Sequence, residues 1–175
     1  MEPSFHIAAS DYLDALRRNG VDHFVTVPDY WQMSVHKRVE QGVPGLKVVR
    51  CCTEEQAVNV SVGLRVGGKR PVVVIQNQGF YACINAVRAA GLDARMPIVF
   101  IVGQFGREFA NFGEEPSKSG RNTVRLLEPV MDALGVRHWR LETENDLPRI
   151  DEAIAYAERE SCPVALIVGA PTAWQ

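Results

Sequence analysis

The chain has 175 residues, of which 46% are hydrophobic and 23% are charged, an ordinary composition for a soluble globular protein with its own core. Its formal net charge of -2 gives no electrostatic basis for binding nucleic acid or an anionic membrane surface. No apolar run approaches the roughly 20 residues of a membrane-spanning helix, and the acidic N-terminal segment lacks the features of a secretory signal.

The cysteines show neither metal-ligand nor redox spacing. No C-x-x-C pair is present, and cysteines that are adjacent in sequence rarely bond to each other. Three of the four lie in or beside apolar segments, where buried free thiols are common. We therefore expect reduced, structural cysteines and a cytoplasmic protein. The four residues are Cys51, Cys52, Cys83 and Cys162.

Sequence patterns in the first half of the chain alternate between helix and strand. Apolar residues at helical spacing predict a helix over 7–19, and Gly20 ends it. Short apolar runs bounded by turn residues predict strands. In order, we then expect a strand at 23–27, a turn at Pro28-Asp29, a helix at 31–41, a strand at 46–51, a helix at 54–66, a strand at 71–76 and a helix at 81–90.

The second half continues this alternation around one long polar segment. We expect a strand at 97–102, the polar segment at 103–122, a helix at 124–134, a strand at 138–141, a helix at 146–160 and a last strand at 163–168. Several strands are apolar at every position, as expected when helices cover both faces of a parallel sheet. The pattern predicts a doubly wound α/β fold with a largely parallel sheet. We expect a single domain over 1–175, because no repeat or linker interrupts the pattern.

Three polar turns follow predicted strands, and they are Pro28-Asp29-Tyr30, Thr53-Glu54-Glu55 and Gln76-Asn77-Gln78-Gly79. In open α/β sheets, ligands bind beyond the carboxyl ends of the strands, where all three turns fall. Each turn alone has an ordinary explanation, because Asp, Asn and Gly favour turns in any protein. Together at one edge of the sheet, they favour a binding site.

The helix predicted at 54–66 is small and apolar, yet it begins with two acidic residues. Thr53 is a good N-cap, and acidic residues in a first turn favour the helix dipole, so a structural role explains one carboxylate. The run from Gly63 to Lys69 nearly spells a phosphate-binding loop. However, it ends a helix and precedes a strand, and Arg70 stands where Ser or Thr is required. We interpret this run as a helix C-cap.

The segment from Cys51 to Asn85 resembles the pyrimidine-binding domain of thiamine diphosphate enzymes. It has, in the same order, a carboxylate, a small-residue helix, a Gly-Gly break, an apolar strand, a Gln-Asn-x-Gly turn and a second helix. More narrowly, it is similar to the α subunit, or N-terminal domain, of sulfopyruvate and phosphonopyruvate decarboxylases, which carry a Glu followed by Ala-Val on this helix. The match places their catalytic glutamate on Glu54. It places their turn on Gln76, Asn77, Gln78 and Gly79.

The resemblance implies a thiamine diphosphate-dependent 2-oxo acid decarboxylase. In such enzymes the cofactor becomes reactive once N1′ of its aminopyrimidine ring is hydrogen-bonded to a carboxylic acid that the protein supplies, and that role falls on Glu54. The substrate would be a small anionic 2-oxo acid, whose sulfonate, phosphonate or carboxylate tail the sequence leaves open. The implied cofactor-binding residues are Pro28, Asp29, Glu54, Gln76, Asn77, Gln78 and Gly79.

One motif of these enzymes is missing from the sequence. They bind the diphosphate and Mg²⁺ through a Gly-Asp-Gly segment that ends in Asn residues, and no Gly-Asp pair occurs here. The resemblance therefore implies half of an active site. We expect an α subunit that needs a partner β subunit to hold the diphosphate and Mg²⁺, in an α2β2 or larger assembly, or a chain cut from a longer enzyme.

The polar segment from Gln104 to Asn122 is long for a loop, and loops of this size are typically functional lids or disordered segments. We expect it to be mobile without partner and substrate. The related decarboxylases have a His after a Glu-Pro here, whereas Glu115-Pro116 is followed by Ser117. Positive charges in the segment could hold an anionic substrate tail, and a solvated loop is the alternative. The candidate substrate contacts are Tyr30, Phe80, Arg107, Lys118 and Arg121.

A second class of function stays open at this point. The chain could be a non-catalytic flavodoxin-like binding or regulatory subunit that keeps the fold without the chemistry. Glu54 argues against this alternative, and the missing His argues for it. Decarboxylase activity on co-expression with the product of the neighbouring gene would separate the two.

Overall fold

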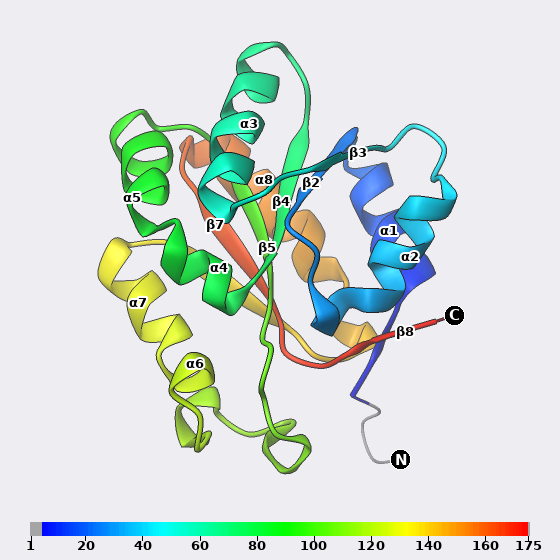
Figure 1. The fold of residues 1–175 in the computed structure, drawn as a ribbon, viewed down its shortest axis with the longest axis vertical. Coiled ribbons are helices and arrows are strands. Elements are labelled where there is room, and N and C mark those ends of the chain that lie inside the picture. The colour runs from blue at the N-terminus through cyan, green and yellow to red at the C-terminus, as the bar shows by residue number, and fades with distance from the viewer. Residues whose placement is uncertain (1–4, 175) are drawn as a thin grey trace.

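The computed structural model describes residues 5–174 and has a six-stranded sheet at its centre (Figure 1). The spatial order of the strands is β3-β2-β4-β5-β7-β6, and every neighbouring pair is parallel. The predicted doubly wound α/β fold is therefore confirmed. The strands are β2 (His23–Thr26), β3 (Lys47–Arg50), β4 (Pro71–Gln76), β5 (Val99–Gly103), β6 (Arg137–Leu141) and β7 (Val164–Val168).

Helices cover both faces of the sheet. They are α1 (Ala9–Arg18), α2 (Met33–Gln41), α3 (Glu54–Val66), α4 (Asn77–Ala82), α5 (Ile84–Ala86), α6 (Asn122–Arg125), α7 (Leu127–Leu134) and α8 (Pro148–Glu160). One face packs against α1, α2 and α8, and the other against α3, α4, α5 and α7 (Figure 1). A π-helix, Val87–Asp93, continues directly from α5.

The alternation of side chains along each strand divides the core into two halves. In β4, Val72 and Val74 pack on the side of α1 and α8, whereas Val73 and Ile75 pack on the side of α3. All four side chains are buried. Burying one such side chain stabilises the fold by about 1.5–3 kcal/mol. Burial on both faces explains why these strands contain no alternating polar residues.

The chain reverses its direction across the sheet next to β2. From β2 it passes outward to β3 and then returns to β4, on the other side of β2. The helix that follows β2 therefore lies on one face of the sheet, and the helix that follows β4 lies on the other. Open α/β sheets bind ligands outside the carboxyl ends of the strands at such a reversal. The turns that begin at Pro28 and Gln76 both leave the sheet here.

The structure differs from the sequence expectations mainly at the ends of elements. Ile7–Ala8, expected to begin a helix, form β1 and pair in parallel with β8 (Thr172–Ala173). Pairing between segments so distant in sequence leaves no local periodicity to detect. The helix expected at 81–90 already begins at Asn77, whose Oδ1 accepts a hydrogen bond from the N–H of Gln78 at 3.0 Å. The helix expected at 31–41 is divided between a 3-10 turn, Tyr30–Gln32, and α2.

Other expectations about local structure are confirmed. Gly68 has φ of 77°, and the N–H of Lys69 donates to the carbonyl of Leu64 at 2.9 Å, so the glycine-rich run is a helix C-cap. The four cysteines, all within residues 5–174, are free thiols.

Two 3-10 turns, Phe109–Asn111 and Pro116–Lys118, interrupt the polar segment. None of the helices in this part of the chain is both long enough and apolar enough to cross a bilayer.

Candidate functional site

The turn after β2 places Asp29 at the centre of the carboxyl edge of the sheet. Its side chain is only 2% exposed and lies over the end of β5, because a Cβ added to Gly103 would come within 1.8 Å of Asp29 Oδ2. A residue with a side chain at that position would displace the carboxylate. Gln76, at the end of β4, also forms a hydrogen bond to Asp29. Asp29 thus connects the ends of three adjacent strands.

Hydrogen bonds hold both carboxylate oxygens of Asp29. The N–H of Trp31 donates to Oδ1 at 2.9 Å, and Nε2 of Gln32 donates to Oδ2 at 2.9 Å. The hydroxyl of Tyr12 donates to Oε1 of Gln32 at 2.9 Å and so fixes the orientation of that amide. Despite these bonds, burial raises the pKa of Asp29 to about 6. This carboxyl group can therefore gain or lose a proton close to neutral pH.

A second buried titratable group, His36, supports the same turn from α2. Its Nε2 accepts a hydrogen bond from the backbone N–H of Asp29 at 3.0 Å, which requires a neutral ring. Burial lowers the pKa of His36 to about 4, so the ring is neutral at physiological pH. The turn is thus anchored to α2 by an uncharged imidazole.

A cavity of about 400 Å³ opens beside Asp29, between α2 and the turns that follow β2 and β4. Four of its lining residues recur on α2 with the spacing of a single helix face. Its volume falls within the range of about 300–1,000 Å³ that is usual for ligand sites. The lining residues are Pro28, Asp29, Tyr30, Met33, His36, Lys37, Glu40 and Gln76.

Glu54 stands at the start of α3, on the neighbouring part of the same edge. Oγ1 of Thr53 accepts a hydrogen bond from the N–H of Gln56 at 3.2 Å, so the predicted N-cap is present. The Glu54 side chain packs on the backbone of α4, because a Cβ added to Gly79 would lie 2.2 Å from its Cγ and 2.5 Å from its Oε1. Glu54 is half-buried, whereas Glu55 is exposed. The first two acidic residues of α3 are therefore in different environments.

The Gln-Asn-x-Gly turn after β4 serves partly as a structural bridge. Asn77 is fully buried, and its Nδ2 donates to the carbonyls of Phe105 at 3.0 Å and Thr123 at 2.9 Å. These bonds tie the start of α4 to both ends of the polar segment. Gln76 is half-buried and lines the cavity beside Asp29, whereas Gln78 is exposed.

Arg107, a predicted substrate contact, is buried in a network of hydrogen bonds. Its guanidinium forms an ion pair with Glu142 and donates to Oε1 of Gln104 at 3.1 Å. It also donates to Oδ1 of Asn111 at 3.1 Å and to the carbonyls of Asn111 and Glu114. A contact between Arg107 and substrate stays a prediction, but in this structure the guanidinium holds the polar segment against the end of β6.

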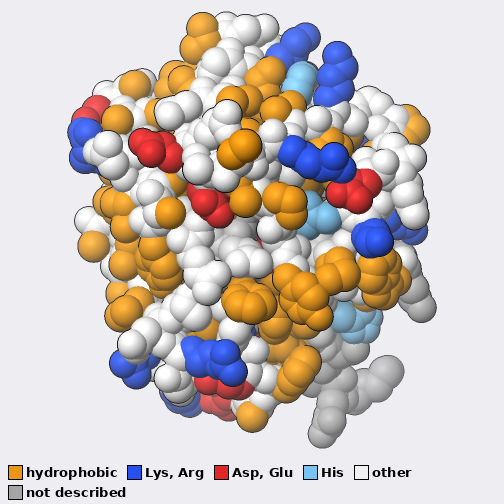
Figure 2. All heavy atoms as spheres, in the orientation of Figure 1, with side chains coloured by type: hydrophobic (Ala, Val, Ile, Leu, Met, Phe, Trp, Pro, Cys, Tyr) orange, Lys and Arg blue, Asp and Glu red, His pale blue; other side chains and the backbone are white. Residues whose placement is uncertain are grey.

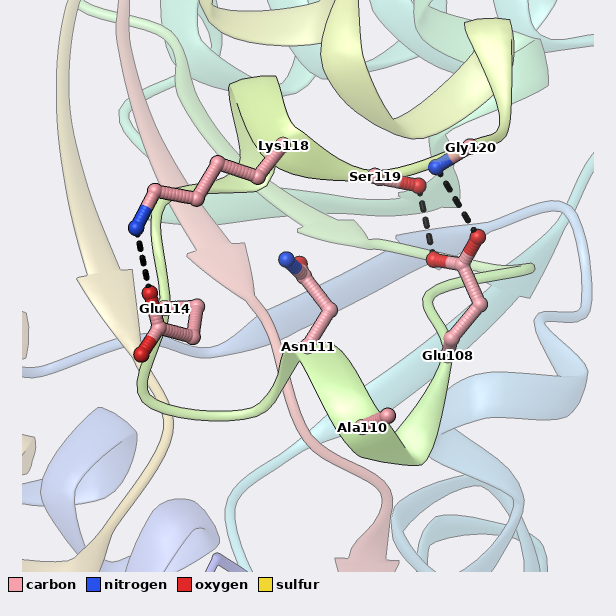
Figure 3. Close-up of a pocket in the computed structure, with 7 residues that line it drawn as sticks. All are labelled: Glu108, Ala110, Asn111, Glu114, Lys118, Ser119 and Gly120. Atoms are coloured by element: carbon pink, nitrogen blue, oxygen red, sulfur yellow. Dashed lines mark hydrogen bonds and ion pairs between the residues drawn. The ribbon is translucent and has the colours of Figure 1, made fainter.

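Lys118 lies in a separate cavity of about 330 Å³ within the polar segment, shown in Figure 3. There Lys118 forms an ion pair with Glu114 at 2.6 Å. On the other side of this cavity, Glu108 accepts hydrogen bonds from the hydroxyl of Ser119 at 2.7 Å and the N–H of Gly120 at 3.1 Å (Figure 3). The acidic residues therefore find their partners inside the segment itself.

The remaining predicted substrate contacts lie in three different environments. Tyr30 lines the cavity beside Asp29 and packs its ring against Phe105 at 6.3 Å between centroids. Phe80 is fully buried against Phe100 in the core and is not among the residues that line the cavity. Arg121 is exposed and lies next to Gly106, and it does not line the cavity. The structure brings Tyr30 together with Pro28, Asp29 and Gln76, but not with Lys118.

Sequence reasoning missed the contribution of α2 to this site. Met33, His36, Lys37 and Glu40 face the cavity, and their spacing directly after the Pro28-Asp29 turn was the available signal. Among residues 5–174, no three His, Cys, Asp or Glu side chains gather in a way that could hold a metal ion. Two buried polar atoms near the edge, Nε2 of Gln104 and Oγ1 of Thr123, have no hydrogen-bond partner within the described residues.

Comparisons with known proteins identify the family of the chain. Residues 8–137 match the family model described as thiamine pyrophosphate enzyme, N-terminal TPP binding domain. The chain is 22% identical over 163 residues to a sulfopyruvate decarboxylase of Methanosarcina acetivorans, covering 93% of this chain but 40% of that protein. It is 23% identical over 158 residues to the sulfopyruvate decarboxylase subunit alpha of Methanocaldococcus jannaschii, covering 90% of each.

A third relative is the sulfopyruvate decarboxylase subunit alpha of Methanothermobacter thermautotrophicus. It is 30% identical over 112 residues, which cover 62% of this chain and 67% of that subunit. The family match spans well over half of the chain and includes β2, α3, β4 and the turns that carry Asp29 and Glu54. The resemblance found in the sequence is confirmed, and the chain belongs to the family of N-terminal TPP binding domains of thiamine pyrophosphate enzymes.

Proposed function

We propose that the chain is the α subunit of a thiamine diphosphate-dependent 2-oxo acid decarboxylase similar to sulfopyruvate decarboxylase. The observation that carries the proposal is the placement of Glu54. Its half-buried side chain packs against Gly79 at the carboxyl edge of the sheet. This part of the chain matches the family model of the TPP binding domain. The names of the relatives supply the reaction class.

The residues at this edge are suited to bind the pyrimidine half of thiamine diphosphate. A carboxylic acid at Glu54 can share a proton with a ring nitrogen, and Gln76 and Gln78 offer amide donors and acceptors. The unpartnered Nε2 of Gln104 and Oγ1 of Thr123 are further polar groups that a ligand or water would satisfy. The predicted cofactor contacts are Pro28, Asp29, Glu54, Gln76, Asn77, Gln78 and Gly79.

Each residue then has a distinct task. Bound thiamine diphosphate supplies the electron sink that makes the loss of carbon dioxide from a 2-oxo acid possible. The carboxyl group of Glu54 would exchange a proton with the aminopyrimidine ring, a general acid–base role. Gly79 keeps that carboxyl group in place, because any side chain there would push it away. Asp29 and Tyr30 line the cavity on the α2 side of the same edge, where the substrate would lie.

A partner subunit completes this proposed site. Two relatives are named as alpha subunits, and the sequence contains no Gly-Asp pair of the kind that binds the diphosphate and Mg²⁺. We therefore assign the diphosphate and Mg²⁺ to a β subunit, in an α2β2 or larger assembly. The substrate is a small anionic 2-oxo acid.

Reconstitution tests this proposal. The purified chain alone should show no decarboxylation of a 2-oxo acid, and activity should appear on mixing with a Gly-Asp-Gly-bearing partner, thiamine diphosphate and Mg²⁺. Release of carbon dioxide from sulfopyruvate and from pyruvate is the readout. A stable complex that binds cofactor without turnover would favour a non-catalytic regulatory subunit instead. Turnover by the chain alone would contradict the half-site assignment.

A further inference from the structure

Lys37 differs from the other cations near the carboxyl edge because it lines the cavity beside Asp29 and is exposed. It takes part in no hydrogen bond or ion pair with any other residue that the structure describes. By contrast, Lys118 is paired with Glu114 in another cavity, and Arg107 is buried against Glu142. Lys37 is therefore a positive charge available to a ligand in the cavity.

The acidic residues that line this cavity are bound to groups other than Lys37. Glu40 lines the cavity, but its carboxylate forms an ion pair at 2.9 Å with Arg50, which does not line the cavity. Both oxygens of Asp29 are occupied by donors from its own turn, and His36 is neutral because it accepts the N–H of Asp29. Neither acidic residue forms an ion pair with Lys37 among the described residues.

No extended positive surface on the face shown in Figure 2 would attract an anion in place of Lys37. On the face shown in Figure 2, basic side chains lie singly or beside acidic ones, with apolar side chains between them. An anion that enters the cavity from this side therefore meets a local charge rather than a broad field. A lysine ammonium is a compact charge suited to the tetrahedral oxygens of a sulfonate or phosphonate.

We infer that Lys37 binds the second anionic group of a 2-oxo acid and makes the site specific for substrates with two negative groups. This inference rests on the proposed decarboxylase function, with the 2-oxo acid end of the substrate placed toward Asp29. Asp29 and Lys37 both line the cavity, and Lys37 stands on the α2 wall one helical turn beyond Met33. Lys37 is then a residue that determines specificity and takes no part in bond breaking.

Kinetics of the assembled enzyme test this role. The full chain is combined with its partner, thiamine diphosphate and Mg²⁺, and sulfopyruvate is compared with pyruvate, which lacks the second anionic group. Lys37→Gln should raise the KM for sulfopyruvate roughly 10- to 100-fold, the range expected for a lost charge-assisted hydrogen bond. Both kcat values and the KM for pyruvate should change little, and Lys37→Arg should restore most of the preference.

Matched variants make the result specific. Arg38→Gln removes a neighbouring exposed charge that does not line the cavity, so it should leave the preference for sulfopyruvate intact. Arg121→Gln removes an exposed cation that does not line the cavity either. An equal effect of Lys37→Gln on both acids, or a loss of preference in Arg121→Gln alone, would overturn the inference.

A binding experiment separates failure of this inference from failure of the proposed function. Sulfoacetate carries a carboxylate and a sulfonate but cannot be decarboxylated by this chemistry, and acetate is its singly charged control. Sulfoacetate should shift the NMR signal of the Lys37 ammonium in the full chain, and Lys37→Gln should weaken binding while Arg38→Gln should not. If the assembly turns over no 2-oxo acid, that binding result still supports Lys37. An active assembly in which sulfoacetate leaves Lys37 unaffected overturns the inference alone.

Discussion

Two regions of the molecule carry charged side chains: the carboxyl edge at β2 and β4, and the polar segment at 104–122. They differ in whether their main charged groups form ion pairs or hydrogen bonds within the protein. In the segment, Arg107, Lys118 and Glu108 all have partners nearby. At the edge, the Lys37 ammonium is available, and Glu54 rests on Gly79 without an ion pair among the described residues. A charge that is already paired holds a structure together, whereas an accessible unpaired charge can bind a ligand.

The largest expected effect at the edge comes from Glu54→Gln. The glutamine keeps the size of the side chain but cannot hold an exchangeable carboxyl proton, so kcat should fall by roughly 10²–10⁴. Folding should change little, because Thr53 still caps α3 and Glu55 still lies in its first turn. The measurement is the exchange of the cofactor C2 proton in the assembled enzyme.

Glu55→Gln is the internal control for this result. Glu55 is exposed and lies about 100° around the helix from Glu54, so its loss should leave proton exchange nearly unchanged. Normal exchange in Glu54→Gln, or a larger defect in Glu55→Gln, would show that the catalytic role was assigned to the wrong acid.

In the polar segment, the large effect should be on stability. Arg107→Gln leaves the Glu142 carboxylate, whose side chain is 12% exposed, without its buried cation, and breaking a buried pair in this way destabilises a protein by about 3–5 kcal/mol. Lys118→Gln removes an exposed, solvent-screened pair and should change the free energy of unfolding far less. Urea unfolding of the two variants measures the difference.

These two variants, together with Arg121→Gln, test whether the polar segment acts as a lid. If the segment contacts substrate, neutralising Arg107, Lys118 or Arg121 should raise KM mainly for acids with two negative groups. Amide hydrogen exchange over 104–122 should also slow when partner and substrate bind. Equal exchange in the free and assembled states, together with unchanged kinetics in all three variants, would leave the segment as solvated surface.

A smaller effect should appear in the pH dependence of folding stability. The pKa of Asp29 is raised from 3.8 to about 6, so its stabilising contribution is lost as pH rises through that range. The pKa of His36 is lowered from 6.5 to about 4, so its contribution is lost as pH falls through nearly the same range. The two trends oppose each other in the native protein.

Asp29→Asn should expose the trend of His36 alone. Between pH 4 and 6.5, the free energy of unfolding of this variant should rise relative to that of the native protein by on the order of 3 kcal/mol. Chemical denaturation at several pH values checks this, and His36→Asn should show the opposite slope. Parallel pH profiles for the variant and native proteins would contradict the assignment of the two titrations.

Local sequence determined the elements and the identity of the main candidate residue. Continuous apolar runs such as Val72 to Ile75 predict strands covered on both faces, because a strand buried on two sides has no position for a polar residue. Thr53 and Gly68 mark the two ends of α3 through capping, which depends only on nearby backbone groups. Glu54 was found because its place between those marks matches a family motif.

Tertiary structure alone decided which polar groups are free and which are paired. The partners of Arg107 include Glu142, 35 residues away, and Asp29 lies over Gly103, so neither relation leaves a trace in local sequence. The pairing of β1 with β8 was hidden for the same reason. Burial and hydrogen-bond pairing depend on the chain elements that meet in space, and sequence spacing constrains those only along a single helix or strand.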